Sequence, residues 1–128
     1  MRRLALLAAL AAAAPAAAYT TSEGYRVEDR GAGRFEVLAS AGQSATESWC
    51  AAGEHAARHL GLGPTERLWR ISAPPRRSGE GVIFSTSPEG ASAKTGLALL
   101  GGDTDGVSVG FAEALCDGLG PFKAEITG

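Results

Sequence analysis

Three absences limit what this chain can be. It contains no asparagine, it has only two cysteines among 128 residues, and after the first eighteen residues no apolar run is long enough to cross a bilayer as a helix. Without asparagine, glycine must fill most left-handed turn positions, so the 18 glycines do not by themselves indicate a phosphate-binding loop. The lack of a later apolar run leads us to expect no membrane partner once the N-terminal segment is removed.

The N-terminal segment has the order of a secretory signal. Its first three residues (MRR) form a positively charged n-region, Leu4–Ala14 is apolar and uncharged, and Ala16–Ala18 provides the small residues of a cleavage site. The apolar run is too short for a permanent anchor, and a short amphipathic or buried helix is the alternative. We therefore predict a signal peptide at 1–18, cleavage before Tyr19, a single domain at 19–128, and a periplasmic or secreted location.

The charge balance argues against two classes of partner. Cleavage would remove two arginines and leave 10 basic against 14 acidic side chains, a net charge of −4. Nucleic acids and anionic membrane surfaces both require a basic binding face. We therefore expect neither as a partner, and the remaining length suits one small domain with a modest core.

The two cysteines, Cys50 and Cys116, form an even set in a chain that we expect to be exported. Oxidising compartments favour a disulfide between them. Such a bond closes a loop of 66 residues, and on the loop-entropy model it would restrict the unfolded chain by about 4 kcal/mol. Two inert buried thiols are the alternative. A catalytic Cys–His pair is less favoured, because a bonded sulfur is not a nucleophile.

The longest periodic segment, 43–62 (QSATESWCAAGEHAARHLGL), predicts the central helix. Ser44 or Thr46 can cap its start, Glu47 is placed for a capping box, and Gly61 ends it. One face is predicted to be buried and holds Trp49, Gly53, Ala56, Ala57 and Leu60. The opposite face is predicted to be solvated and holds Ala51, Glu54 and Arg58, the last two as an i,i+4 pair. Because the buried face is mostly alanine and glycine, we expect a β-sheet to approach it closely.

A first hairpin is predicted before this helix. Residues 24–30 and 34–40 both alternate between apolar and polar side chains, and Gly33 suits the left-handed position of the three-residue loop between them. The matching register places Val27 opposite Val37 on one face of the pair.

A second hairpin is predicted after the helix. It pairs residues 66–72 with 81–87 across a connection that contains two prolines and cannot be regular strand. A register with Trp69 opposite Val82 satisfies the apolar alternation of both segments. We expect these two strands to be central in the sheet.

The C-terminal third predicts one more strand and one more helix. Residues 96–100 (GLALL) read as a short strand, and a helix is capped by Ser108, carries Cys116 in its last turn and ends at Gly118. The fold class is therefore α+β. We expect an antiparallel sheet of four to five strands in the order ββα-ββ(β)-α, with one long and one short helix packed on one face and one disulfide.

A pair of histidines, His55 and His59, has metal-ligand spacing. Four residues apart on a helix, two imidazoles share one face and can bind zinc or copper. Glu54 precedes the first histidine rather than following it, so the metalloprotease arrangement is absent, and no third ligand is evident. The alternative is a pair of partly exposed, water-bonded side chains at the border of the buried face.

The only local basic cluster is Arg76 and Arg77, which follow two prolines. Arginines on a stiffened loop suit recognition of a carboxylate, a phosphate or an acidic partner. A charged loop that merely keeps the hairpin soluble is the alternative. We expect any partner-binding surface here and along the edge strand beside it.

Two other motifs suggest chemistry but fail on spacing. Around Ser92 and Lys94, the nucleophile elbow lacks its second glycine and the Walker loop lacks Gly-Lys, so a solvated loop is favoured over a Ser/Lys dyad. Around Asp103–Gly106, the glutamate of a calcium loop would come one residue late, and a simple turn is favoured. No nucleophile, base and orienting group occur together, so we expect neither catalytic activity nor a cofactor.

One motif carries a resemblance. Trp49-Cys50-Ala51-Ala52-Gly53, preceded by Phe35-Glu36-Val37 in an alternating hairpin and followed by a strand and a second cysteine, resembles small exported alphaproteobacterial proteins of unassigned function over most of the predicted mature chain. The resemblance implies a periplasmic setting and a two-cysteine pattern, with no activity to carry over. We expect a periplasmic interaction or accessory module, inhibitor-like or subunit-like, with an unknown protein partner. A small-ligand or metal carrier that uses His55 and His59 is the alternative.

Overall fold

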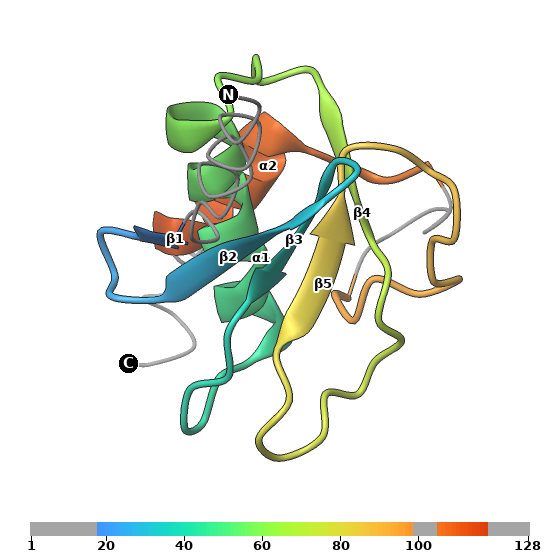
Figure 1. Cartoon of the computed structure of the whole chain (residues 1–128). Helices are drawn as coiled ribbons and strands as arrows, with labels where there is room; N and C mark the ends of the chain where they lie inside the picture. Colours follow the sequence, from blue (N-terminus) through green and yellow to red (C-terminus); the bar gives the residue numbers. More distant parts are fainter. Residues whose placement is uncertain (1–17, 99–104, 118–128) are drawn as a thin grey trace, which may run out of the picture.

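The computed structural model describes residues 18–98 and 105–117. The elements within these ranges, in chain order, are β1 (Ala18–Thr20), β2 (Arg26–Gly31), β3 (Arg34–Val37), α1 (Ala45–Glu54), a π-helical turn (His55–His59), β4 (Arg67–Arg70), β5 (Val82–Ser85), β6 (Val107–Ser108), α2 (Val109–Ala114) and a 3₁₀ turn (Leu115–Asp117). The strands form one antiparallel sheet in the order β1-β2-β3-β5-β4-β6. Both helices lie on the same face of this sheet (Figure 1).

The predicted fold class is confirmed. The chain is α+β, with an antiparallel sheet, two helices and a disulfide between Cys50 and Cys116. The sheet has six strands rather than four to five, because the short strands β1 and β6 extend it at either edge. Residues 1–17 of the predicted signal peptide lie outside the described residues, and the predicted cleavage and domain boundaries stay predictions.

The first hairpin has the predicted register. Val27 lies opposite Val37, with Asp29 opposite Phe35, and Gly33 adopts a φ of 78° in the turn. On the solvent side, the Arg30 guanidinium bonds to the carboxylates of both neighbouring glutamates, at 2.9 Å from Glu28 and 2.6 Å from Glu36. A register shift between Asp29 and Gly31 places Gly31 opposite Arg34, so the loop has two residues, Ala32 and Gly33, rather than the predicted three. Such a short loop holds the two strands so close together that the sequence pattern determines most of their pairing.

The predicted register of the second hairpin is wrong. Trp69 lies opposite Ser85, not Val82, and Arg70 lies opposite Phe84. The prediction placed Trp69 opposite the buried Val82, whereas Leu68 and Arg70 are the buried residues of β4 and Trp69 is only half-buried. The long connection between β4 and β5 does not fix a register as a tight turn does. The prediction that these strands are interior to the sheet is confirmed.

The predicted strand at 96–100 is also wrong for its described part. Gly96 has a φ of 85°, and the Leu97 N–H bonds to the Thr95 hydroxyl, which curls the chain. Residues 96–98 are therefore irregular, and 99–100 lie outside the described residues. The additional strand in the C-terminal third is instead β6, which pairs with the free edge of β4 and places Val107 opposite Leu68.

The central helix begins as predicted. The Ser44 hydroxyl accepts from the Glu47 N–H, and the Glu47 carboxylate accepts from the Ser44 N–H, which completes the capping box. Gly61 takes a φ of 73° just beyond the π-helical turn, in agreement with its predicted role as the helix end. The second helix is likewise capped by Ser108, whose hydroxyl accepts from the Phe111 N–H.

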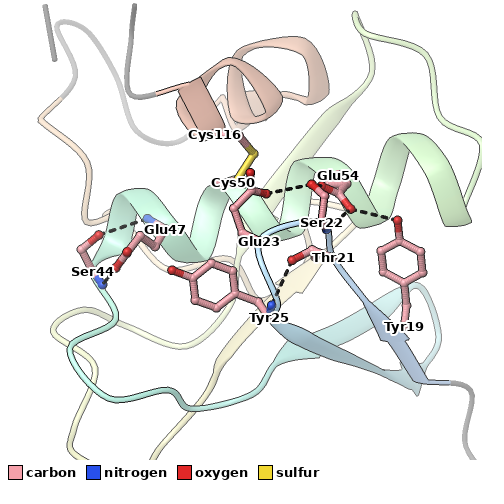
Figure 2. The surroundings of a disulfide bond; sticks show 10 residues. All are labelled: Tyr19, Thr21, Ser22, Glu23, Tyr25, Ser44, Glu47, Cys50, Glu54 and Cys116. Atoms are coloured by element: carbon pink, nitrogen blue, oxygen red, sulfur yellow. Dashed lines mark hydrogen bonds between the residues drawn. A yellow bond between two sulfur atoms is a disulfide. The ribbon is translucent and has the colours of Figure 1, made fainter. Parts of the chain in front are cut away.

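The predicted solvated face of the central helix is wrong for Ala51 and Glu54, which are buried, and confirmed for Arg58, which is exposed. All residues from Ser48 to Glu54 are buried, whereas Leu60, which was predicted to be buried, is 42% exposed. Three layers enclose the helix: Trp49 packs edge-on against Phe84 of the sheet at 4.6 Å, α2 covers another side, and the segment after β1 crosses a third (Figure 2). A helical wheel drawn for α1 alone cannot predict the packing of α2 or of the segment after β1.

The two helices approach most closely at Gly53. A β-carbon built there would lie 2.7 Å from the Ala112 Cβ and 2.7 Å from the Glu113 backbone nitrogen. The close approach predicted from the small residues of α1 thus includes a helix, α2, as well as the sheet. The disulfide joins α1 to the 3₁₀ turn that follows α2, with 4.8 Å between the two Cα atoms (Figure 2).

Gly53→Ala should therefore destabilise the protein by about 2 kcal/mol, although alanine is intrinsically the better helix former. The added methyl group would push α2 away from α1. Urea denaturation followed by tryptophan fluorescence measures the change. Gly63→Ala is the matched control, because a β-carbon there meets only the Glu66 carboxylate at 3.7 Å. A Gly53→Ala protein as stable as the control would contradict the assigned helix contact.

Among the described residues, no helix has the length and apolar character needed to span a membrane.

Candidate functional site: a cavity at the start of α1

A cavity of about 260 Å³ lies between the start of α1 and the connection from β4 to β5. The loop before α1 and the loop after β4 extend from the same end of the sheet (Figure 1). Among the described residues, the charged ones that line the cavity are two arginines, Arg70 and Arg76, and none of the lining residues is acidic. Apolar walls come from Pro74, Pro75 and Val82. The cavity therefore combines a positive charge with a partly apolar lining.

Arg70 is a buried cation without a carboxylate partner in the described part of the chain. Its side chain is 3% exposed, its Nε donates to the Ser72 carbonyl at 2.7 Å and its Nη1 to the Thr95 carbonyl at 3.2 Å. Burial, and then the nearby Arg76 guanidinium, lower the pKa of Arg70 from its ordinary value. Two carbonyls orient the guanidinium but leave its charge uncompensated, so an anion in the cavity would be favoured.

Arg76 braces the loop that carries it. Its guanidinium donates to four backbone carbonyls, those of Arg77 and Glu80 in its own loop and those of Ser40 and Gln43 in the loop before α1. It thereby fixes one wall of the cavity. Arg77 is exposed, and its side chain has no bonded partner among the residues that the structure describes. Of the two arginines that the sequence predicted to bind a partner, Arg76 therefore braces the loop and Arg77 is exposed to solvent.

The start of α1 adds polar groups to the cavity. Gln43, Ser44, Ala45 and Ser48 all line it. The capping box occupies the N–H groups of Ser44 and Glu47, and Ala45 is the first residue of α1, whose opening N–H groups have no partner within the helix. The positive end of the helix dipole points toward the same space.

Gln43 has an unused acceptor. The side chain is 8% exposed, and its Nε2 donates to the Ser48 hydroxyl at 2.7 Å. Its Oε1 is buried and has no partner in the described structure. A buried acceptor of this kind is destabilising unless a donor reaches it.

The two histidines lie at the opposite end of α1. His55 is 2% exposed, so it is not at the border of the buried face, and its ring contacts Phe35 at 4.6 Å and Tyr19 at 5.6 Å. His59 is exposed and stacks on His55 with 5.0 Å between the ring centroids. Burial, and then the nearby His59, lower the pKa of His55 to about 4.

The structure does not add a third ligand group to the histidines. In the described ranges, the one cluster of three or more potential metal ligands is Glu23, Cys50 and Cys116, and its sulfurs are bonded to each other. The buried Nδ1 of His55 has no partner. Zinc or copper binding by the histidine pair stays a prediction.

Glu54 anchors the N-terminal strand onto the helix (Figure 2). Its carboxylate accepts from the Tyr19 hydroxyl at 3.0 Å, from the Ser22 hydroxyl at 2.6 Å and from the Ser22 N–H at 2.8 Å. Burial raises the pKa of this carboxyl, but the bonds from Ser22 and Tyr19 outweigh burial and lower it overall. Glu54 is thus a structural acceptor rather than the solvated partner of Arg58 that the sequence predicted.

The remaining motifs show turn geometry where they are described. The Ser92 hydroxyl accepts from the Lys94 N–H at 3.2 Å, a local turn contact, and the Lys94 side chain is exposed. Of the Asp103–Gly106 motif, residues 103 and 104 lie outside the described residues, and Asp105 is in a turn.

Sequence reasoning missed Arg70 and Gln43. A signal for Arg70 was present, because strict alternation in β4 places it on the same face as Leu68, and a charged residue on a core face is unusual. Gln43 carried no signal of its own. Its burial results from the loop before α1 being held by Arg76, a residue 33 positions away.

Comparisons of this chain with protein-family models, with curated proteins and with solved structures return no match. Function is therefore inferred from the side chains themselves.

Proposed function

We propose that this protein is an exported interaction module without catalytic activity, and that its partner docks where the cavity at the start of α1 opens beside Arg77. The observation that carries the proposal is the composition of that cavity. Of the residues that the structure describes, two arginines and no acidic residue line it, and one of these arginines is a buried cation without a carboxylate partner there. Such an arrangement suits capture of an anionic group on another molecule.

Two further features support a binding role. The four backbone bonds of Arg76 hold the loop in place before any partner arrives, which reduces the ordering cost of association. The disulfide and the enclosed helix α1 form a rigid body that presents this loop. An exported location is part of the proposal, and a disulfide is compatible with it.

Site-specific photo-crosslinking in living cells tests the proposal. A photoreactive amino acid at position 77 should give a discrete covalent adduct with one partner in the cell envelope. The same amino acid in place of Arg58, an exposed residue in the π-helical turn at the far end of α1, is the matched control. Adducts from position 58 equal to those from position 77, or none from position 77, would refute the proposed docking face.

A further inference from the structure

We propose that reduction of the disulfide turns its two cysteines, together with Glu23, into a binding site for a zinc ion. The three residues come from segments far apart in the chain: Glu23 follows β1, Cys50 lies in α1 and Cys116 lies in the turn after α2. A carboxylate oxygen of Glu23 and the two sulfurs all lie within 4.8 Å of one another. The site is separate from the cavity of the proposed function, with which it shares no described lining residue.

In the oxidised protein, the Glu23 carboxylate faces a sulfur that cannot donate to it. Its Oε1 lies 3.8 Å from the Cys50 Sγ (Figure 2), and a bonded sulfur has no proton to donate. The Ser22 hydroxyl lies 3.0 Å from the same oxygen, but its one proton is also offered to the Glu54 carboxylate, at the shorter distance of 2.6 Å. A metal ion held by the reduced sulfurs would give this carboxylate a partner.

The three ligand atoms select the kind of metal. Thiolates favour zinc and copper(I), carboxylates favour harder divalent ions, and zinc accepts both in tetrahedral sites. Zinc with three protein ligands keeps a fourth position for water. A cavity of about 350 Å³ provides room for that water, because Glu23 and Cys116 both line it.

The charges around the sulfurs favour a cation once the bond is broken. Four carboxylates line the same cavity, and a single basic side chain, Arg58, accompanies them among its described lining residues; the carboxylates are those of Glu23, Glu54, Glu113 and Asp117. Nearby carboxylates oppose the formation of two free thiolates, and a divalent ion compensates this repulsion. The thiolates are therefore better stabilised with a metal ion than without one.

Reduction is a thiol–disulfide exchange with a dithiol of another protein. A thiolate of that dithiol attacks the Cys116 sulfur, which is half-buried and lines the cavity, and the Cys50 sulfur leaves as a thiolate. The second thiol of the reductant then displaces Cys116 and forms a disulfide, so two electrons and two protons pass to this chain. Binding of Zn²⁺ releases the two thiol protons. The sulfurs hold either the bond or the metal, so oxidation releases the ion.

Helix packing keeps the ligands close together after reduction. Cys50 lies one turn before Gly53, where α1 and α2 approach so closely that an added β-carbon would lie 2.7 Å from the Ala112 Cβ. The Cα atoms of the two cysteines are 4.8 Å apart. In a tetrahedral zinc site the sulfurs need to separate only to about 3.8 Å, which rotation of the cysteine side chains can provide.

Titration of the intact protein with cobalt(II) tests the inference, because cobalt bound by thiolates absorbs in the near ultraviolet. The protein is first reduced with a phosphine and kept free of oxygen. We expect one equivalent of cobalt to produce the thiolate-to-cobalt band, and one equivalent of zinc to abolish it by displacing cobalt. The oxidised protein is the matched control and should show neither the band nor tight binding. No band at millimolar cobalt, one metal ion for two chains, or equally tight binding to the oxidised protein would overturn the site.

Glu23→Gln tests the third ligand without changing the cysteines. It should weaken cobalt binding to the reduced protein about tenfold, because the amide oxygen that replaces the carboxylate carries no charge. Glu113→Gln is the matched control. It removes a carboxylate from the same cavity but not from the ligand cluster, and it should leave the affinity within about threefold. Equal affinities of the Glu23→Gln and wild-type proteins would overturn the assignment of Glu23.

Hydrogen exchange distinguishes a folded site from metal bound to a loosened chain. Zinc should slow exchange at the amides of α2 in the reduced wild-type protein, because the ion replaces the lost link between Cys50 and Cys116. Exchange in the oxidised protein should not respond to zinc. Exchange in α2 that stays fast in the reduced protein at saturating zinc would overturn the site.

Discussion

Replacing both Cys50 and Cys116 with alanine should lower the free energy of unfolding by about 4 kcal/mol. The bond spans 66 residues, and the loop-entropy model assigns a loop of that length roughly this stabilisation. Small domains owe a large share of their stability to such a bond, because their cores are limited in size. Urea denaturation of the wild-type and double-alanine proteins under identical conditions measures the difference.

The loss should be concentrated in α2. This helix has six residues and a 3₁₀ turn, too short to be stable on its own, and it packs on α1 at Gly53. Hydrogen exchange should therefore accelerate first at the amides of α2, and later at those of the sheet. Reduction of the wild-type protein should reproduce the effect of the double variant. A change in unfolding free energy below about 1 kcal/mol would show that packing alone holds α2 in place.

Acidification should destabilise the protein through His55, beginning near pH 6.5. The pKa of His55 is about 4 in the folded protein, against 6.5 for the free side chain. Above pH 6.5 both states hold a neutral imidazole, and the stability is fully present. As the pH falls, the unfolded state binds a proton that the folded state rejects, so stability declines down to the folded pKa. The full difference corresponds to about 3 kcal/mol.

In the upper part of this pH range, the loss of stability can be assigned to His55. The pKa of Glu54 is lowered in the folded protein, so its own contribution is lost only as the pH falls further, below the ordinary carboxyl range. His59 opposes protonation of His55, and Asp29 favours it. Between pH 6.5 and 5, His55→Gln should abolish a loss of about 2 kcal/mol, whereas His59→Gln, at the exposed ring, should retain most of it. A wild-type protein of constant stability across this interval would contradict the burial of a neutral His55.

The features that sequence predicted well are local ones. The capping box of Ser44 and Glu47 lies within three residues, and a two-residue loop, one residue shorter than predicted, fixes the register of the first hairpin. The disulfide followed from an even cysteine count in a chain expected to be exported. In each case the interacting residues are close in sequence, or there is only one way to pair them.

The features that sequence missed depend on distant segments. The local sequence predicts Glu54 to be a solvated helix residue, because the bond that it accepts from the Ser22 N–H comes from a segment 32 positions earlier. The second hairpin slipped by three residues because its long connection imposes no register. The cavity combines groups from the loop before α1, from β4 and from the loop after it, so its residues share no sequence motif.

Backbone amide chemical shifts during a titration of the wild-type protein with acetate, a small carboxylate, test most directly whether the cavity at the start of α1 is an anion-binding site. The account predicts saturable shifts of the Ala45 amide and of the Arg70 guanidinium N–H groups. Resonances at the far end of α1, such as that of Arg58, should stay in place. Shifts confined to the far end of α1, or no shifts at all, would contradict the account.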